Sequence, residues 1–136
     1  MLRVMEIEKA REFIRANHRA VLSTRRRSGS AHMSPVLVGI DAEGRAVIST
    51  NEGRAKALNL RRDPRASVCV MSNRFFGPWL QIDGSAEVLS LPEATEPLVE
   101  YYRAVAGEHA DWADYRASLE REQACLIRIT IDHAAP

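Results

Sequence analysis

The sequence predicts a small, mainly β domain: an antiparallel β-barrel with peripheral helices. Six short runs are apolar or alternate between apolar and polar residues, and turn signals separate them. The last run places Cys125, Ile127 and Ile129 on one face and Arg128 on the other. Six strands of this length tend to close on themselves, because closure protects their edges. The six predicted strands are 20–24, 32–40, 45–50, 66–72, 79–89 and 124–131.

The first half of the chain reads as a helix followed by strands. Residues 6–17 carry apolar side chains at helical spacing and therefore predict an amphipathic helix. A basic hairpin connection, residues 25–29, joins the first two strands. Pro35 lies inside the second strand and has no N–H to donate. It marks an edge, a bulge, or a place where a ligand replaces a neighbouring strand. We expect the first three strands to form an antiparallel meander.

The second half alternates helices with long strands. A short helix after the third strand ends at Asp63, before Pro64. Gly84 interrupts the fifth strand and predicts a β-bulge. Pro92 is expected at the first position of a helix that ends at Gly107. Another helix is expected over residues 111–122.

Composition narrows the class of protein. The 136 residues suit one domain, residues 1–136, and 46% hydrophobic with 27% charged residues is ordinary for a globular chain. The formal net charge of +1 gives no strong field toward nucleic acid or an anionic membrane. No run is long enough to cross a bilayer, and no signal peptide is evident. We therefore expect a cytoplasmic protein with neither nucleic-acid nor membrane partners.

Residues that often carry catalysis or metals are scattered. Cys69 and Cys125 lie far apart in apolar runs, which predicts two buried core cysteines. The four histidines form no metal-ligand spacing, and no Ser-His-Asp or Cys-His arrangement is recognisable. No GxGxxG motif follows a strand. The sequence thus predicts no metal site and no dedicated catalytic residue.

The junction of the third strand and its helix predicts an anion-binding site. The strand ends in Ser49 and Thr50, and the helix begins with Arg54 and Lys56. A helix N-terminus favours an anion through its backbone N–H groups and dipole, and both cations suit phosphate. The function we favour is binding of a cofactor phosphate. A solvated amphipathic helix with basic residues for solubility is the alternative.

Four stretches together resemble a known family: AVLSTRRRSGSAHMSPV, VISTNEGRAKALNLRRDPRASVCV, WLQIDGSAEV and YYRAVAGEHADWADYR. They resemble the flavin and deazaflavin oxidoreductases that share the six-stranded split β-barrel, or FMN-binding split barrel, of pyridoxamine 5′-phosphate oxidase. The similarity is greatest to the actinobacterial branch that uses coenzyme F420. The GRAKALNLRRDPRASV run is its most specific part.

The resemblance implies a homodimer with the cofactor at the interface. It implies that Arg54 and Lys56 bind the cofactor phosphate beside Ser49 and Thr50, and that Trp79 lines the pocket. The strand segment that runs along the ring system would be Ser34, Pro35 and Val36. Coenzyme F420 is the expected cofactor and FMN the alternative.

Function follows as an expectation from the same resemblance. Reduced deazaflavin would pass a hydride to a small unsaturated or quinone-like acceptor. An FMN-binding oxidoreductase, or a carrier that binds F420 or haem without turnover, is the alternative. Arg25, Arg26 and Arg27 either attract the glutamyl tail of F420 or form a solvated hairpin. Aromatic residues divide into two sets, one that would cover the ring (Phe75, Phe76, Trp79) and one expected in helix packing or dimerisation (Tyr101, Tyr102, Trp112, Tyr115).

Overall fold

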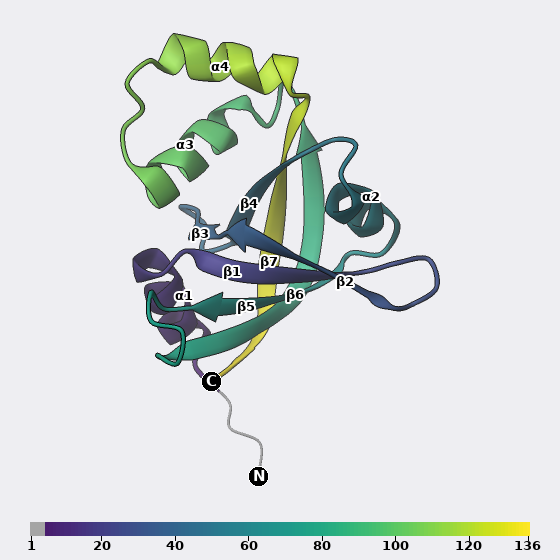
Figure 1. Cartoon of the computed structure of the whole chain (residues 1–136), viewed down its shortest axis with the longest axis vertical. Helices are drawn as coiled ribbons and strands as arrows, with labels where there is room; N and C mark the ends of the chain where they lie inside the picture. The colour runs from purple at the N-terminus through teal and green to yellow at the C-terminus, as the bar shows by residue number, and fades with distance from the viewer. Residues whose placement is uncertain (1–4) are drawn as a thin grey trace.

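Seven strands form one curled antiparallel sheet in the computed structural model, which describes residues 5–136 (Figure 1). The strand order is β2-β1-β5-β6-β7-β4-β3. The strands are β1 Arg19–Arg25, β2 Ala31–Leu37, β3 Gly39–Ile40, β4 Ala46–Asn51, β5 Arg65–Met71, β6 Trp79–Ser90 and β7 Ala124–Ala135. The helices are α1 Ile7–Ala16, α2 Ala55–Arg62, α3 Thr95–Ala106 and α4 Trp112–Arg121.

The barrel is split at Val38, which corrects the predicted count of six strands. The predicted strand 32–40 divides there into β2 and β3, which occupy opposite edges of the sheet. The Val38 N–H donates to the His18 carbonyl at 2.8 Å, and the Val38 side chain is fully buried. Both antiparallel pairs of the predicted meander are present, β1 with β2 and β3 with β4, but they lie at opposite edges of the sheet and not side by side. One residue of chain joins the two edges of the sheet.

The predicted bulge at Gly84 is confirmed. The register between β6 and β7 shifts between Asp83 and Gly84. A Cβ atom on Gly84 would lie only 2.0 Å from the Thr130 carbonyl oxygen, so the position requires glycine. The shift lets β7 continue to Ala135, beyond the predicted end at residue 131.

Helix boundaries agree with expectation except at Pro92. The Ala94 N–H donates to the Ser90 carbonyl and the Thr95 N–H to the Pro92 carbonyl, so a turn precedes α3. Pro92 consequently lies outside the helix. Gly107 ends α3 with a φ of +83°, a conformation that glycine adopts without strain. Within the described residues, no helix is both long and apolar enough to span a lipid bilayer.

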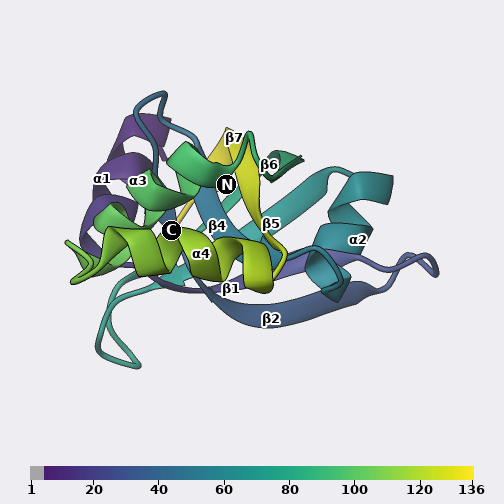
Figure 2. The ribbon, with the colours of Figure 1, turned by 90° about the horizontal axis from the view of Figure 1, so that it is seen from above.

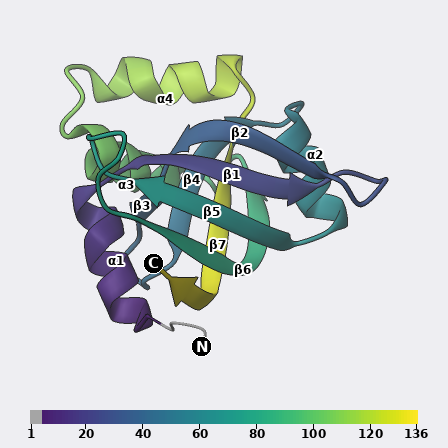
Figure 3. The ribbon, with the colours of Figure 1, turned by 60° about the horizontal axis from the view of Figure 1, so that its bottom comes forward.

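Two hydrophobic cores lie on opposite faces of β4 and β7. The barrel interior contains fully buried side chains such as Leu22, Ile48 and Ile127. The second core joins the outer face of the sheet, through Val47 and Leu126, to α3 and α4. Helices thus cover the outer face at β4 and β7, whereas β2, β1 and β5 face the viewer without a helix over them in Figure 3. Helices α1 and α2 lie at opposite ends of the sheet (Figure 2).

The two cysteines differ in their environment. Cys125 is buried, as predicted, and burial raises the pKa of its thiol to about 11. Cys69 is only partly buried, because it lies on the outer face of β5 that no helix covers. The prediction of a core position is therefore wrong for Cys69. Both thiols are unpaired.

Candidate functional site

The turn between β4 and α2 is closed by backbone hydrogen bonds. The Arg54 N–H donates to the Asn51 carbonyl at 3.0 Å, and the Glu52 N–H donates to the Gln123 carbonyl at 2.9 Å. Arg54 is the N-cap residue of α2, and its side chain makes no capping hydrogen bond. The first N–H groups of a helix have no partner within the helix. The start of α2 therefore offers backbone donors to an anion.

The carboxylate of this turn points away from those donors. Glu52 Oε2 accepts a hydrogen bond from Arg61 at 2.6 Å, and Oε1 accepts one from the Ser90 hydroxyl at 2.6 Å. Arg61 lies in the last turn of α2, whereas Arg54 and Lys56 lie at its start. Glu52 thus neutralises the far end of the helix.

Arg54 and Lys56 are left without a counter-charge. Within residues 5–136, neither side chain forms an ion pair. Burial lowers the pKa of Lys56, and the positive charge of Arg54 lowers it further. An anion placed between the two cations would relieve this repulsion, which is the electrostatic condition of a phosphate site.

Helix α2 also fixes the basic hairpin in place. The Asn59 amide donates to the Thr24 hydroxyl at 3.1 Å, and both side chains are buried. Arg62 donates to the carbonyl of Arg25 at 2.7 Å. The hairpin projects beside α2 at the right of Figure 1. Two basic stretches that are far apart in sequence therefore meet at α2: residues 54–56 lie at its start, and residues 25–27 adjoin its end.

The predicted ring-binding segment lies on an edge strand. β2 is the first strand of the sheet and pairs with β1. Val36 packs against the barrel core, and Pro35 points outward and is exposed. The Ser34 hydroxyl oxygen and His32 Nδ1 are buried and have no partner among the described residues. An unpartnered buried polar atom is costly, and it marks a place where a ligand or water completes the structure.

Ser49 and Thr50 face opposite sides of the sheet. Thr50 follows the alternation of Ile48 toward the barrel interior, and Ser49 follows Val47 toward α3. A ligand on one face can meet only one of the two side chains, so the other residue can contribute only its backbone groups.

Tyr101 links β2 to β4 through hydrogen bonds that the sequence did not predict. Its hydroxyl donates to the carbonyl of Leu37, at the end of β2, at 2.7 Å. Burial raises the pKa of Tyr101, and hydrogen bonding to Ser49 of β4 partly offsets that rise. Tyr101 packs in the second core, as expected. The additional signal was the hydroxyl itself, since a buried tyrosine needs a partner for it.

Trp79 is not brought to the α2 residues within one chain. It begins β6 and is 52% exposed. It follows a loop, residues 72–78, in which Phe75 and Phe76 are 87% and 96% exposed. This loop and α2 lie at opposite ends of the sheet in Figures 1 and 3. The assignment of Trp79 to the cofactor pocket therefore requires a second chain.

A cavity of about 630 Å³ lies elsewhere, between α3, the β3–β4 turn and β7. None of the predicted cofactor residues lines it. In the described part of the chain, no three His, Cys, Asp or Glu side chains group as metal ligands.

Comparisons with known proteins place this geometry in a family. Residues 7–135 match the model of the pyridoxamine 5′-phosphate oxidase family. Among solved structures, the conserved hypothetical protein Rv2991 from Mycobacterium tuberculosis is 22% identical with a TM-score of 0.79, and the match covers 98% of this chain and 87% of that one. A structure named F420 reductase is 14% identical with a TM-score of 0.69, over 91% and 94% of the two chains.

A third neighbour has a different named ligand. A haem-binding protein from Mycobacterium smegmatis is 19% identical with a TM-score of 0.72. The match covers 98% of this chain and 54% of that one. At these identities the structural matches establish the split-barrel fold and leave the ligand to be argued from the site.

Proposed function

This chain belongs to the pyridoxamine 5′-phosphate oxidase family, and from that premise we propose that it is an F420-dependent oxidoreductase. It would transfer a hydride from reduced deazaflavin to a small unsaturated or quinone-like acceptor. The observation that carries the proposal is the set of cations around α2 that form no ion pair within residues 5–136: Arg54, Lys56 and the hairpin arginines 25–27.

The start of α2 would hold the cofactor phosphate. Arg54 supplies a planar fork of donors, Lys56 a compact charge, and the first turn its backbone N–H groups. Charge-assisted hydrogen bonds of this kind contribute about 1.5–3 kcal/mol each. Thr50 or Ser49 would add one hydroxyl, since the two face opposite sides of the sheet. These groups fit a phosphate of either F420 or FMN.

The hairpin favours F420 over FMN. Arg25, Arg26 and Arg27 adjoin α2 through the bond from Arg62 to the Arg25 carbonyl. Helix α2 has eight residues and is about 12 Å long, so cations lie both at the phosphate end and well beyond it. FMN ends at its phosphate, whereas F420 continues into a chain of carboxylates. Of the two cofactors, only the longer one would reach the second group of cations.

The edge of β2 would receive the ring. The ring is a flat apolar plate with a polar edge, so it needs backbone groups and a few polar side chains. Ser34, Pro35 and Val36 lie on a strand with one unpaired edge, and the Ser34 hydroxyl has no partner in the part of the chain that the structure describes. When bound, the reduced cofactor supplies the hydride, and these residues orient the ring and exclude water.

We further propose a homodimer with the cofactor between the subunits. The uncovered face of the sheet exposes large apolar side chains on β2 and β6: Met33 is 65% exposed, Leu37 45% and Trp79 52%. A second copy of the chain on this face would bury these side chains. The Trp79 of each copy would then lie toward the α2 end of the other copy. Light scattering should then give twice the 15.2 kDa mass of the chain, and Met33→Glu with Leu37→Glu should give monomers.

Cofactor titration tests the proposed function. F420 and FMN are added separately to purified protein, and binding is followed by calorimetry and by fluorescence. The proposal requires tighter binding of F420 than of FMN. Tight FMN binding without F420 binding would make the chain an FMN oxidoreductase of the same fold.

Turnover separates an enzyme from a carrier. Reduced F420 is mixed with the protein and a panel of quinones, unsaturated lactones and tetrapyrroles, and its reoxidation is followed. Oxidation by at least one acceptor, at a rate above the protein-free control, supports the proposed enzyme. Binding of F420 without turnover across the panel would support the carrier instead.

A further inference from the structure

The cavity beside α3 has the size and lining of a small-molecule site, and it is separate from the proposed cofactor residues. Its volume of about 630 Å³ falls in the range of ligand pockets. Val47 and Leu126, which are almost fully buried, form an apolar floor, and Ala104 of α3 adds to it. Arg45 and Arg128 line the same cavity. An apolar floor beside arginines suits a ligand with an apolar body and an anionic end.

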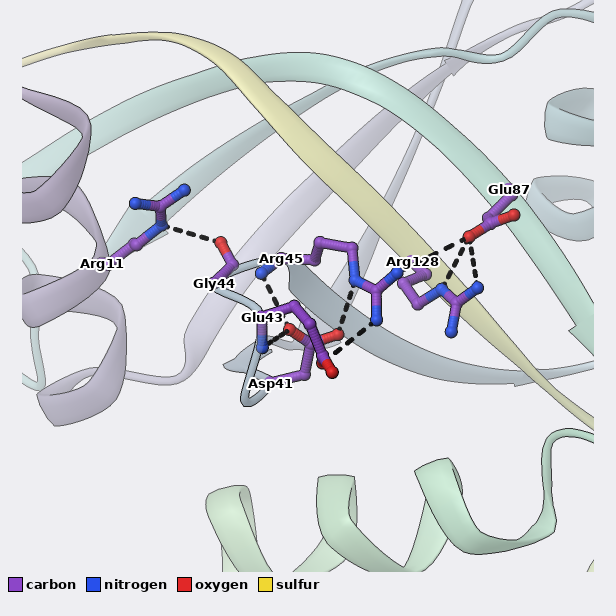
Figure 4. Close-up of polar contacts among 7 residues, drawn as sticks. All are labelled: Arg11, Asp41, Glu43, Gly44, Arg45, Glu87 and Arg128. Carbon is purple, nitrogen blue, oxygen red and sulfur yellow. Dashed lines mark hydrogen bonds and ion pairs between the residues drawn. The ribbon is translucent and has the colours of Figure 1, made fainter.

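One exposed carboxylate serves both of these arginines. Glu87 Oε1 accepts from Arg128 Nε at 2.7 Å and lies 2.5 Å from Arg128 Nη2. The same oxygen lies 4.0 Å from Arg45 Nη1. The Arg128 and Arg45 side chains are only 20% and 27% exposed, whereas that of Glu87 is 57% exposed. Figure 4 shows the two guanidinium groups converging on this one carboxylate.

Glu87 is not among the residues that line the cavity, and the carboxylates that do line it already have partners. Asp41 and Glu43, at the β3–β4 turn, both bind Arg45. On α3, Glu100 binds Arg103 and Glu96 binds Arg116. Among the described residues, Glu87 is therefore the single carboxylate paired with Arg128. An exposed ion pair contributes little to stability, so Glu87 can be displaced at small cost.

We propose that this cavity binds a small amphipathic carboxylate, such as a medium-chain fatty acid, whose carboxylate replaces Glu87 on Arg128. The guanidinium fork of Arg128 accepts any carboxylate in the same geometry. The apolar tail of the ligand packs against Val47 and Leu126 and is thereby removed from water. The Glu87 side chain has no apolar tail and gains nothing from this burial. The residues that line the cavity are different from the proposed cofactor residues.

The test uses the full chain with octanoate as the probe. Binding is followed by NMR through the Nε–H signals of Arg45 and Arg128 and the amides of α3. The wild type should show saturable shifts with a Kd on the order of 1 mM, as a ligand of so few atoms allows. Octanamide, which has the same shape without the charge, should bind at least tenfold more weakly.

Two variants with opposite effects keep the test decisive. Arg128→Gln should weaken octanoate binding at least tenfold, and Glu87→Gln should tighten it at least twofold because the internal competitor loses its charge. Arg121→Gln, an exposed arginine of α4 that is absent from the cavity lining, is the matched control and should stay within twofold. Equal binding of octanamide, unchanged binding in both test variants, or no saturable shift would each overturn the proposal.

Discussion

The cationic side chains at the two ends of β4 differ in whether they have carboxylate partners. At the end that leads into α2, Arg54 and Lys56 have no ion-pair partner among residues 5–136. At the end that follows the β3–β4 turn, Arg45 contacts three carboxylates, those of Asp41, Glu43 and Glu87.

This difference separates a structural use of arginine from a binding use. Arg45 holds its own turn, since its backbone N–H also donates to the Asp41 carboxylate at 2.9 Å. Glu52 could have neutralised Arg54, yet it is bonded to Arg61 and Ser90. Cations that the chain leaves unpaired beside a helix N-terminus are available to an external anion. The account therefore predicts different consequences of mutation at the two ends.

The largest effect should follow from removing both cations of the β4–α2 turn. Arg54→Ala with Lys56→Ala should weaken cofactor binding at least tenfold, because two charge-assisted contacts are lost. The fold should persist, since neither side chain forms an ion pair with any other described residue. Calorimetry measures the affinity, and Lys9→Ala with Arg121→Ala, two exposed cations on other helices, is the matched control. Equal losses in both double variants would remove the distinction between bound and solvated cations.

Asn59→Ala should give the next largest effect, on stability. It removes the buried bond to the Thr24 hydroxyl and leaves that hydroxyl without its partner. The expected cost is about 1–3 kcal/mol in the free energy of unfolding. Glu87→Gln removes the charge of the β6 carboxylate that pairs with Arg128. It should change the free energy of unfolding by about 1 kcal/mol or less, because its ion pair is exposed. Urea denaturation of both variants compares them, and a larger loss in Glu87→Gln would reverse the assignment of structural weight.

Replacing Arg25, Arg26 and Arg27 with glutamine should affect one cofactor only. F420 binding should weaken about tenfold, or about 1.4 kcal/mol, while FMN binding should stay nearly unchanged. The affinity for F420 should also become less sensitive to salt, because fewer charges attract the tail. Parallel titrations at two salt concentrations measure both. A similar loss for FMN would show that the hairpin acts on the phosphate or on the fold.

The smallest effect concerns Lys56 and pH. Its pKa is lowered in the folded chain, so the unfolded chain binds more protons at pH values between the two pKa values. The Lys56 contribution to stability should therefore rise as the pH increases toward the unfolded pKa, whereas the raised pKa of the Cys125 thiol makes that group's contribution fall. Lys56→Met should remove this rise and increase stability at pH 7 by about 0.5 kcal/mol or less. Thermal unfolding at pH 7 and pH 10 compares the two chains, and an equal change of stability with pH in both would contradict the assignment to Lys56.

The sequence was informative where local chemistry decides the structure. A glycine inside a strand indicates a bulge, and at Gly84 the structure leaves no room for a side chain. A glycine after a helix indicates the helix end, and Gly107 has a positive φ. Pro92 was misplaced, because a proline also suits the turn before a helix and the sequence does not distinguish the two positions.

Long-range contacts were not predictable from pattern alone. The break at Val38 depends on His18, twenty residues earlier, and β2 otherwise reads as continuous with β3. The bond from Tyr101 to Leu37 spans 64 residues. For the candidate site, the residue types around α2 were predictable. That Arg54 and Lys56 lack carboxylate partners within the described residues was not, because it depends on the direction of the Glu52 side chain. That direction is set by Ser90 and Arg61, which only the fold brings together.

The structure of the cofactor complex decides whether the start of α2 binds the phosphate. In a crystal grown with F420, we expect the cofactor phosphate within about 2.7–3.2 Å of Lys56 Nζ and of the first N–H groups of α2. We also expect the glutamyl tail along the Arg25–Arg27 hairpin. A cofactor bound with its phosphate away from α2, and with Arg54 and Lys56 still in solvent, would contradict the account.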